Sequence, residues 1–435
     1  TNVFAVPHDG GYIVYAPLAG RVMHANGECV AQLKRYVETR DPGVVDEAVA
    51  RRLGGLSWLD DAAEPVPLPF DRHYHPTAVT LFLTNRCNLR CTYCYAEAGE
   101  FEAREMAPEV YRAAIDLVAR NARRAGCPVG VGFHGGGEPT LAWHALTGAV
   151  EYVRSVVGDR GVSLAIATNG VMSRDRAEFV ATTFPTVTLS LDGTADGQNE
   201  QRPFPDGPGS FDAVMSFVEV LERHGTPFVI RSTVTEHSLE RQAELVDFFI
   251  DHTKCRQFHF EPVFDAGRRH RTVGRSVSSI SFAESFMAAF DRASERGARL
   301  RYSAARLGGP FLSFCGVAQD PLSVTPDGDV TACFEVCRRG NPLSKSFFFG
   351  RYEPQQGRFV IDMERLASLR SVIVVNKPLC DGCIARWSCS GDCPVKTGGT
   401  VLDFERPSPR CSMNRAITKD LLVRAVEGRL CHYPL

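Results

Sequence analysis

Hydrophobic and polar residues follow two alternating patterns along the chain from about residue 77. Short runs with the composition of strands are separated by longer stretches that have the period of an amphipathic helix. The runs predict strands at 79–84, 130–134, 163–168, 186–191, 228–234 and 257–263. The stretches between and after them predict helices at about 108–124, 143–157, 174–183, 211–224, 239–251 and 281–296. This alternation is typical of a parallel sheet with helical crossovers.

Six strand–helix units, rather than eight, predict an α/β fold with a partial (β/α)6 barrel. The active site of such a fold is expected at the carboxyl ends of its strands. The alternation stops after about residue 305, where Cys, Gly and Pro dominate. We therefore expect the barrel to occupy residues 71–304 and a separate cysteine-rich region to occupy 305–435.

A smaller module is predicted before the barrel. Residues 11–15 and 21–24 have the pattern of a β-hairpin around a turn-like segment at 17–20, and helices are predicted at 30–39 and 44–53. Residues 60–69 are acidic and rich in proline, as in a linker. We place the module and its linker at residues 1–70.

Composition and charge exclude several classes of protein. The 435 residues include 49 Lys and Arg against 51 Asp and Glu, a net charge of -2. This balance argues against binding to nucleic acid or to a membrane surface through bulk charge. The apolar runs are too short to span a bilayer, and residues 1–11 lack the features of a secretion signal. We therefore expect a cytoplasmic protein.

The cysteine content changes this ordinary picture. Fifteen cysteines are too many for a typical cytosolic enzyme and too few for a disulfide scaffold of this length. Most of them fall into a front group at 87–94 and a rear group between 315 and 411, which indicates metal or cluster sites. Cys29, Cys127 and Cys255 stand alone and are expected to be small buried residues, whereas Cys431 carries no expectation.

The front group is Cys87, Cys91 and Cys94, in a loop directly after the first predicted barrel strand. Three thiolates at these spacings can converge on three irons of a cubane, which leaves one iron open for an added ligand. A zinc site would need a fourth protein ligand, and none is obvious beside the loop. The remaining alternative is three buried cysteines that fall together by chance.

The front loop resembles that of the radical S-adenosylmethionine (SAM) superfamily, including the aromatic Tyr93 before the last cysteine. The resemblance covers about residues 75–300 and includes the His134–Pro139 segment, HGGGEP, after the second strand. A glycine-rich turn alone is usually only a turn. The resemblance implies that Cys87, Cys91 and Cys94 bind a [4Fe–4S] cluster that binds SAM, and that Gly136, Gly137 and Glu138 meet the SAM amino group. It also implies that Thr168, Asn169, Ser190 and Asp192 line the SAM cleft.

Three charged residues are weaker candidates. Arg231 and Arg202 fit positions where relatives place cations near the SAM carboxylate or the substrate, although Arg231 also suits a structural ion pair. Glu261 is as easily structural as functional. The sequence indicates no catalytic residue.

The rear cysteines resemble the SPASM domain, which carries two auxiliary [4Fe–4S] clusters. Cys315 and Cys333 form a C-x12-G-x4-C pattern, and the run from Cys380 to Cys393 reads C-x2-C-x5-C-x3-C. The resemblance implies that Cys315, Cys333 and Cys393 bind the first auxiliary cluster, and that Cys380, Cys383, Cys389 and Cys411 bind the second. A zinc ribbon is an alternative for the C-x2-C pair. We expect Cys337, four residues after Cys333, to complete the first cluster; otherwise one of its irons is open.

The combined resemblance implies a peptide-modifying enzyme that cleaves SAM reductively to a 5′-deoxyadenosyl radical. We expect it to install an intramolecular cross-link, whether C–C, ether or thioether, in a ribosomally made precursor peptide, with electrons from a flavodoxin or ferredoxin. Residues 5–58 loosely resemble the small winged-helix modules that bind a leader peptide as an added strand. The alternative is that these residues form a structural cap on the barrel. Oxidation of Cys or Ser to formylglycine, as by sulfatase maturases, is an alternative, but Phe334 replaces the acidic residue of that family. A nonenzymatic iron–sulfur electron carrier is a further alternative.

Overall fold

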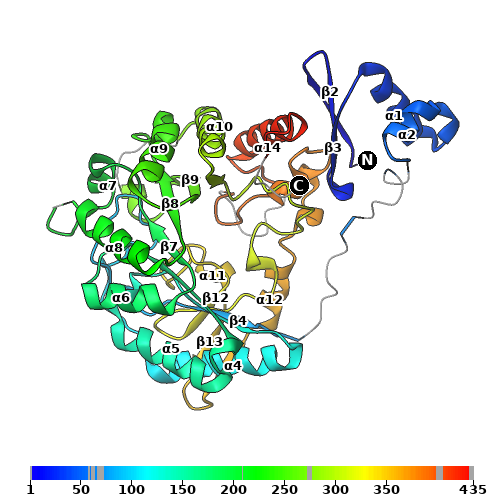
Figure 1. Cartoon of the computed structure of the whole chain (residues 1–435). Coiled ribbons are helices and arrows are strands. Elements are labelled where there is room, and N and C mark those ends of the chain that lie inside the picture. The colour runs from blue at the N-terminus through cyan, green and yellow to red at the C-terminus, as the bar shows by residue number, and fades with distance from the viewer. Residues whose placement is uncertain are drawn as a thin grey trace.

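The computed structural model describes residues 2–56, 59, 64–65, 73–207, 209–271, 277–397 and 405–430. Most of the predicted linker at 60–69 and Cys431 lie outside these residues. Within the described part, one long sheet forms the centre of the molecule and a small sheet forms a separate layer near the N-terminus (Figure 1).

The long sheet contains the six predicted barrel strands in sequence order, and every neighbouring pair among them is parallel. These strands are β4 (Ala78–Leu81), β5 (Val129–Phe133), β6 (Val162–Thr168), β7 (Val187–Ser190), β8 (Phe228–Val234) and β9 (Gln257–Pro262). A seventh parallel strand, β10 (Arg299–Arg301), lies at the edge beside β9 and was not predicted. The sheet does not close on itself, which confirms the predicted α/β partial barrel.

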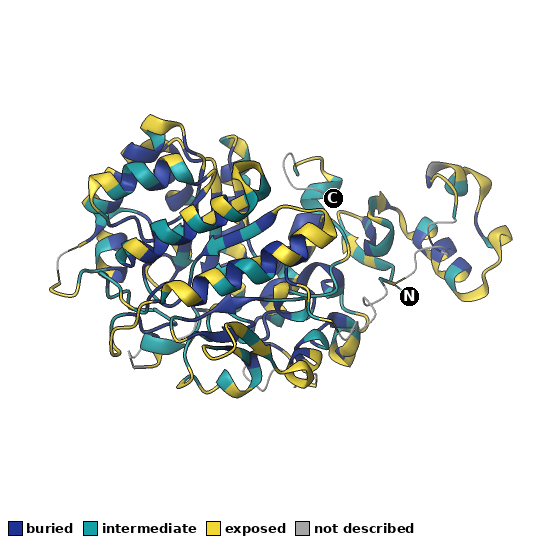
Figure 2. Cartoon of the chain, turned by 90° about the horizontal axis from the view of Figure 1, so that it is seen from below, coloured by how far each residue is buried: buried dark blue, intermediate teal, exposed yellow. Residues whose placement is uncertain are grey.

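Helices connect these strands and cover the outside of the sheet. They are α4 (Pro108–Ala125), α5 (Trp143–Val157), α6 (Arg174–Thr183), α7 (Ala195–Gln201), α8 (Phe211–His224), α9 (Gln242–His252) and α10 (Ser279–Glu295). Each predicted helix lies within a few residues of its expected bounds, whereas α7 was not predicted. Figure 2 shows their inner faces buried and their outer faces exposed. No helix in the described part of the chain combines the length and apolar character needed to cross a bilayer.

The cysteine-rich region extends the same sheet past β4. Strand β11 (Ser323–Val324) pairs in parallel with β4, and β12 (Asp329–Thr331), β13 (Phe348–Glu353) and β14 (Arg358–Ile361) follow as antiparallel neighbours. The helices of this region are α11 (Ser344–Phe347), α12 (Met363–Arg370), α13 (Arg386–Cys389) and α14 (Cys411–Val426). The region therefore shares a sheet with the barrel, and the division near residue 304 stays a prediction.

The N-terminal layer is a three-stranded antiparallel sheet of β1 (Phe4–His8), β2 (Gly11–Ala16) and β3 (Arg21–Ala25), followed by α1 (Gly27–Thr39) and α2 (Glu47–Arg52). The hairpin and both helices were predicted, and β1 was not. Alternate residues of β2 face opposite ways because of the pleat. Val14 packs with α1 in a small core that belongs to the N-terminal layer, whereas Ile13 is part of the main core. Helix α14 lies against the N-terminal sheet (Figure 1).

Tyr302 joins the barrel to the cysteine-rich region and provides a test of this packing. It is buried against Phe282 and Phe286 of α10, and its hydroxyl donates a 2.7 Å hydrogen bond to Asn414 Oδ1 of α14. Tyr302→Phe should cost about 1–2 kcal/mol, because the amide oxygen loses its donor. Tyr302→Ala should cost about 3–5 kcal/mol, because it also leaves a cavity. Urea unfolding of the two variants checks this order, and equal losses would contradict it.

Candidate active site

The front cysteines lie in one loop that leaves β4 and lines a single pocket. Cys94 N–H donates to Cys91 O (3.2 Å), which makes a tight turn, and Thr92 N–H donates to Gln201 O (2.9 Å) at the end of α7. Cys87, Cys91 and Cys94 all contribute to the wall of the pocket. Among the described residues, no three His, Cys, Asp or Glu side chains meet closely enough to chelate a single metal ion. The thiolates of a cubane stand further apart, because iron and sulfide lie between them.

These thiols are buried, and N–H groups point at the sulfur of Cys87. Burial, followed by the neighbouring thiols, raises the pKa of Cys87 to about 12, and burial raises that of Cys91 to about 11 against the lowering effect of Arg202. Metal binding must therefore displace their protons. Two N–H groups point at the Cys87 sulfur, from Leu89 N (3.4 Å) and from Asn169 Nδ2 (3.7 Å). Hydrogen bonds to cluster ligands of this kind tune the reduction potential.

The glycines of the HGGGEP segment lie directly against the cysteine loop. Gly136 has φ of +71°, and a Cβ there would stand 2.9 Å from Thr84 O. A Cβ on Gly137 would overlap the carbonyl of Arg86, and Glu138 N–H donates to the same carbonyl at 2.8 Å. These positions need glycine because two backbones pass in contact. The backbone of Gly136 and Gly137 thus reaches the pocket beside the thiols.

The Glu138 carboxylate is bound by the protein itself. It is 3% exposed and accepts hydrogen bonds from the Thr140 amide (3.2 Å) and hydroxyl (2.8 Å), the Thr168 hydroxyl (2.8 Å) and the Asn169 amide (2.8 Å). Both oxygens are therefore used to join the ends of β5 and β6. Glu138 also lines the pocket, so the expected contact with the SAM amino group stays a prediction for Glu138 and for the glycine backbone.

Asp192 has a similar positioning role around Tyr93. The Tyr93 hydroxyl donates to Asp192 and accepts from Arg202 Nη1 at 2.8 Å, while Thr233 N–H donates to the other Asp192 oxygen at 3.0 Å. Asp192 is 1% exposed; burial raises its pKa, and Arg202 acts in the opposite direction. The group fixes the aromatic residue of the cysteine loop against the end of α7. Arg202 also lines the pocket, so this weaker candidate lies at the site.

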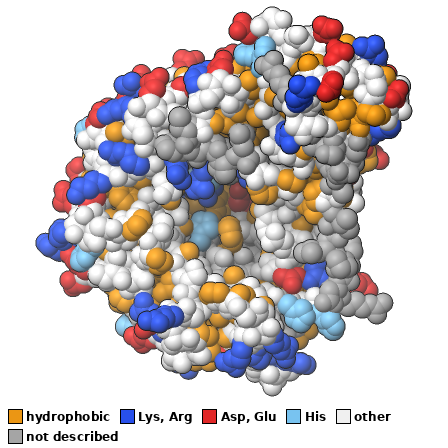
Figure 3. All heavy atoms as spheres, turned by 45° about the vertical axis from the view of Figure 1, so that its right-hand side comes forward, with side chains coloured by type: hydrophobic (Ala, Val, Ile, Leu, Met, Phe, Trp, Pro, Cys, Tyr) orange, Lys and Arg blue, Asp and Glu red, His pale blue; other side chains and the backbone are white. Residues whose placement is uncertain are grey.

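The pocket has a volume of about 210 Å³ and combines residues of the barrel and the cysteine-rich region. Thr168, Asn169, Ser190 and Arg231 lie in its wall as expected from the motifs. Arg231 has no ion pair or side-chain hydrogen bond with any described residue. The sequence did not indicate His134, Tyr95, Phe264, Glu335 and Lys396, which also line it. Figure 3 shows a hollow on this side of the molecule with histidine and basic side chains inside.

His134 is the pocket residue that the position of a motif could have revealed, because it directly follows β5. Its ring packs edge-on against Phe334 at 5.0 Å between centroids. Burial, followed by the charge of Arg231, lowers the pKa of His134 to about 4. The imidazole is therefore neutral near pH 7 and has both a donor and an acceptor nitrogen.

Four rear cysteines share a second cavity of about 250 Å³: Cys380, Cys383, Cys389 and Cys411. They come from the segment around α13 and from the first turn of α14. Asn414 Nδ2 donates to the Cys389 sulfur at 3.2 Å. Four thiols around one enclosed space, with an N–H···S bond, form a donor set that fits a cubane.

The remaining rear cysteines differ in which neighbouring thiols influence them electrostatically. The charges of Cys393 and Cys315 raise the pKa of Cys333, after burial, whereas the thiol that acts on Cys337 is Cys94 of the front loop. An ion pair between Arg338 and Glu97 fixes the chain after Cys337 to the front loop. The expectation that Cys337 completes the first auxiliary cluster stays a prediction.

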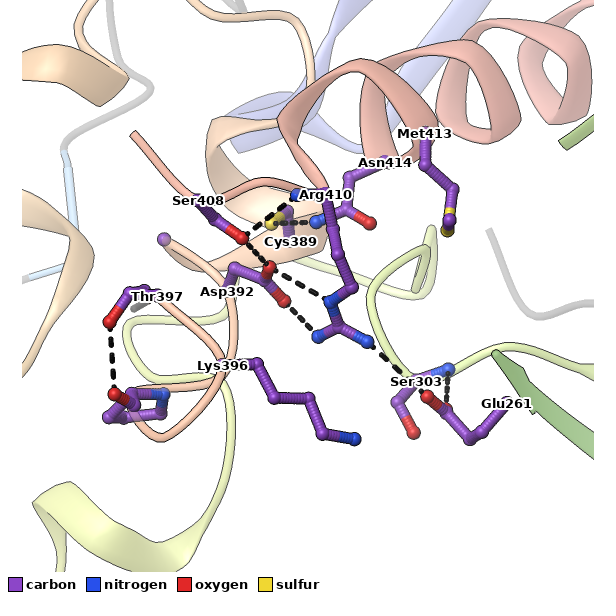
Figure 4. Close-up of polar contacts among 12 residues, drawn as sticks. Glu261, Ser303, Cys389, Asp392, Lys396, Thr397, Ser408, Arg410, Met413 and Asn414 are labelled. Atoms are coloured by element: carbon purple, nitrogen blue, oxygen red, sulfur yellow. Dashed lines mark hydrogen bonds and ion pairs between the residues drawn. The ribbon is translucent and has the colours of Figure 1, made fainter. Parts of the chain in front are cut away.

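A buried chain of charges connects the pocket with the rear cysteines (Figure 4). Arg410 forms an ion pair with Asp392 through two guanidinium nitrogens. Its Nη1 atom also lies 3.5 Å from Glu261 Oε2. The other Glu261 oxygen accepts from Ser303 N–H and His259 Nε2, both at 2.9 Å. Glu261 lines the pocket and is held in place by these partners.

The isolated cysteines differ in exposure. Cys255 is buried and its thiol donates to Phe228 O at 3.1 Å, and Cys29 is half-buried. Cys127 is exposed, which corrects the expectation of a buried residue. The reason is its place after the left-handed cap at Gly126, where the chain leaves α4 at the surface.

Residues 81–249 match the model of the radical SAM superfamily. The chain carries a radical SAM domain. Fe-coproporphyrin III synthase of Methanosarcina barkeri is 28% identical over 48% of this chain and 50% of its own. Mycofactocin maturase MftC of Mycolicibacterium smegmatis is 25% identical over 80% of this chain and 87% of its own. A serine-type anaerobic sulfatase-maturating enzyme of Klebsiella aerogenes is 23% identical over 77% of this chain and 82% of its own.

Solved structures share the fold of this protein over most of the chain. Native anSMEcpe with bound AdoMet matches with a TM-score of 0.65 at 18% identity, over 82% of this chain and 100% of its own. Streptococcus suis SuiB bound to the precursor peptide SuiA matches with a TM-score of 0.56 at 14% identity, over 94% of this chain and 98% of its own. The chain spans about half the length of the first curated relatives that it matches.

The close backbone approach at Gly137 leads to a direct test. Gly137→Ala should displace the cysteine loop and reduce the iron bound at the front site, because the added Cβ overlaps the Arg86 carbonyl. Gly197→Ala in α7 is the matched control, since a Cβ there meets only atoms at 3.9 Å or more. Iron and sulfide analysis after anaerobic reconstitution measures the effect. Equal iron in both variants would show that the loop adapts without loss.

Proposed function

We propose that this protein is a radical SAM enzyme of the SPASM type that installs an intramolecular cross-link in a ribosomally made peptide. One observation carries the proposal: a loop with three thiols, backed by a glycine segment, lines a pocket to which the cysteine-rich region contributes Glu335 and Lys396. When bound, the front cluster and SAM supply a 5′-deoxyadenosyl radical that abstracts hydrogen from the substrate. The protein supplies ligation, orientation and exclusion of water.

The residues divide the pocket into a cofactor side and a substrate side. Cys87, Cys91 and Cys94 would hold the cluster that binds SAM. Gly136, Gly137, Thr168, Asn169, Ser190 and Arg231 would contact SAM, whereas Tyr93, Glu138 and Asp192 hold this wall in shape. The unpaired guanidinium of Arg231 suits the SAM carboxylate, because charge-assisted hydrogen bonds are strong in a partly enclosed site. His134, Phe264 and Lys396 remain to meet a peptide.

The rear cysteines would bind two auxiliary clusters. Cys380, Cys383, Cys389 and Cys411 would hold one of them in their common cavity, and Cys315, Cys333 and Cys393 the other. Formation of a cross-link removes two hydrogens from the peptide, one with the radical and one as a proton with an electron left over. An auxiliary cluster would accept that electron, and a flavodoxin or ferredoxin would supply electrons to the front cluster.

A precursor peptide as partner is supported by two of the relatives. SuiB is solved with the precursor peptide SuiA, and MftC is a maturase. Helices α1 and α2 lie on one face of the N-terminal sheet, and α14 lies on the other. An added strand would therefore pair with an edge of this sheet. We propose that a leader peptide binds there, within residues 5–58, through backbone hydrogen bonds.

Formylglycine formation is the second candidate, because sulfatase-maturating enzymes are among the relatives. Phe334 occupies the position at which that family has an acidic residue, and it packs against His134 and Phe82. A phenyl ring cannot take a proton from the substrate. This difference favours formation of a cross-link over formation of formylglycine. A nonenzymatic iron–sulfur electron carrier would have no use for the SAM side of the pocket.

The chain should contain about twelve irons after anaerobic reconstitution, because three cubanes hold four irons each. Iron and sulfide analysis of the purified protein tests this number. A value near four would refute both rear sites and leave only the front cluster.

Variants in the two cysteine groups should separate cofactor cleavage from product formation. Cys91→Ala should abolish release of 5′-deoxyadenosine, because the cluster that binds SAM loses one of its three thiolates. Cys383→Ala should retain some uncoupled cleavage and yield no product, detected as a peptide that has lost two hydrogens. Liquid chromatography with mass spectrometry measures both. Identical loss in both variants, with altered circular dichroism, would indicate misfolding instead.

A further inference from the structure

A second groove lies at the edge of the long sheet, apart from the pocket beside the front cysteines. It has a volume of about 360 Å³, against about 210 Å³ for that pocket. Its walls are the strand β10, the end of α10 and the loop at 306–311. Gln257, at the start of β9, lines the groove, whereas Glu261 and Pro262, at the end of the same strand, line the pocket. The groove is therefore a separate site at the amino ends of these strands.

The free edge of β10 borders this groove. Arg299 N–H donates to Arg256 O at 2.9 Å, and residues 299–301 pair in parallel with β9. Because the hydrogen-bonding groups of a strand alternate between its two edges, Leu300 directs its N–H and C=O away from β9. No strand in the described part of the chain pairs with that side of β10. The edge is therefore open to an added strand.

The loop that forms another wall of the groove is held by the cysteine-rich region. Arg306 Nη2 donates to Ser390 Oγ at 2.9 Å and to Ser313 O at 3.2 Å. Phe311 N–H donates to Trp387 O at 3.0 Å, and the Arg306 guanidinium lies 4.2 Å from the centroid of the Phe311 ring. These contacts fix the loop beside β10 without pairing it to the free edge, so the groove is built into the fold.

The two faces of β10 differ in chemistry. Successive side chains of a strand point to opposite faces, so Arg299 and Arg301 share one face and the buried Leu300 lies on the other. Both arginines are exposed, and neither forms an ion pair or a side-chain hydrogen bond with any described residue. Among the described residues that line the groove there is no Asp or Glu, and Phe290 and Leu307 give it an apolar interior. The groove therefore combines uncompensated positive charge with an apolar wall.

We propose that this groove binds an extended peptide strand in which acidic and apolar residues alternate. The strand pairs with the backbone of Leu300, as in β-augmentation. Side chains at the same register of neighbouring strands lie on the same face, so its acidic residues lie beside Arg299 and Arg301 and its apolar residues beside Leu300. A second copy of this chain is disfavoured, because pairing of two β10 edges brings arginines together. The site goes beyond the proposed function, since it uses neither a cluster nor SAM.

Fluorescence anisotropy with the full chain, after anaerobic reconstitution, tests the proposal. The probe is a short labelled peptide of alternating Glu and Leu, which should bind saturably. Arg299→Glu and Arg301→Glu together should weaken its binding about tenfold, a loss of about 1.4 kcal/mol. The same double variant should gain binding of the peptide with Lys in place of Glu, because the charges are exchanged. Arg120→Glu and Arg160→Glu together are the matched control, since both arginines are exposed and outside the groove, and should leave binding unchanged.

A second pair of probes tests the strand pairing itself. Methyl groups on one alternate set of the peptide's amide nitrogens should abolish binding and those on the other set should not, because only alternate N–H groups face the paired strand. Equal binding of both methylated peptides, equal binding by the Arg299→Glu and Arg301→Glu variant and the unaltered chain, or no binding at all would overturn the proposal. A dimer in sedimentation that dissociates in this variant would assign the edge to a second copy and overturn it too. Release of 5′-deoxyadenosine tests the proposed function separately, because it does not depend on this groove.

Discussion

The pairing of β11 with β4 is the contact on which the arrangement of the cysteine loops depends. Thr80 N–H donates to Leu322 O at 2.8 Å and Phe82 N–H donates to Val324 O at 2.9 Å. These bonds join two strands that are more than 240 residues apart in the sequence. They fix the cysteine-rich region to the strand that carries the front loop. The chain after β12 then reaches the pocket, where Phe334 packs against Phe82 and Glu335 enters the wall.

The opposite side of the open barrel is held by charge instead of by strand pairing. Arg410 joins Glu261, at the end of β9, to Asp392, between two rear cysteines, and all three side chains are buried. A buried ion pair often adds little net stability, because desolvation offsets the attraction. Removing one partner is nevertheless costly, since it leaves a buried charge uncompensated. The network therefore specifies one position of the rear loops relative to the pocket.

The sequence predicted the barrel well and the rear region poorly, for physical reasons. Barrel strands such as 228–234 alternate with long amphipathic helices, and this periodicity is a local signal. Strands β11 and β12 have two and three residues, too short to show a period, and they form because β4 offers an edge. The role of Cys337 stays a prediction, because its distance from Cys333 along the chain does not determine the direction of the loop. That direction depends on the contact of Arg338 with Glu97, which no local pattern reveals.

The carboxylates at the site illustrate why motif residues and reactive residues are different sets. Glu138 and Glu261 face the pocket, yet protein donors bind both oxygens of each. These bonds hold both carboxylates in position. The side chains that remain on the proposed substrate side of the pocket are the neutral His134, Phe264 and Lys396, and none of these was proposed from the sequence. Recognition of the cofactor can thus be predicted from motifs, whereas recognition of the substrate depends on side chains that meet only in the folded chain.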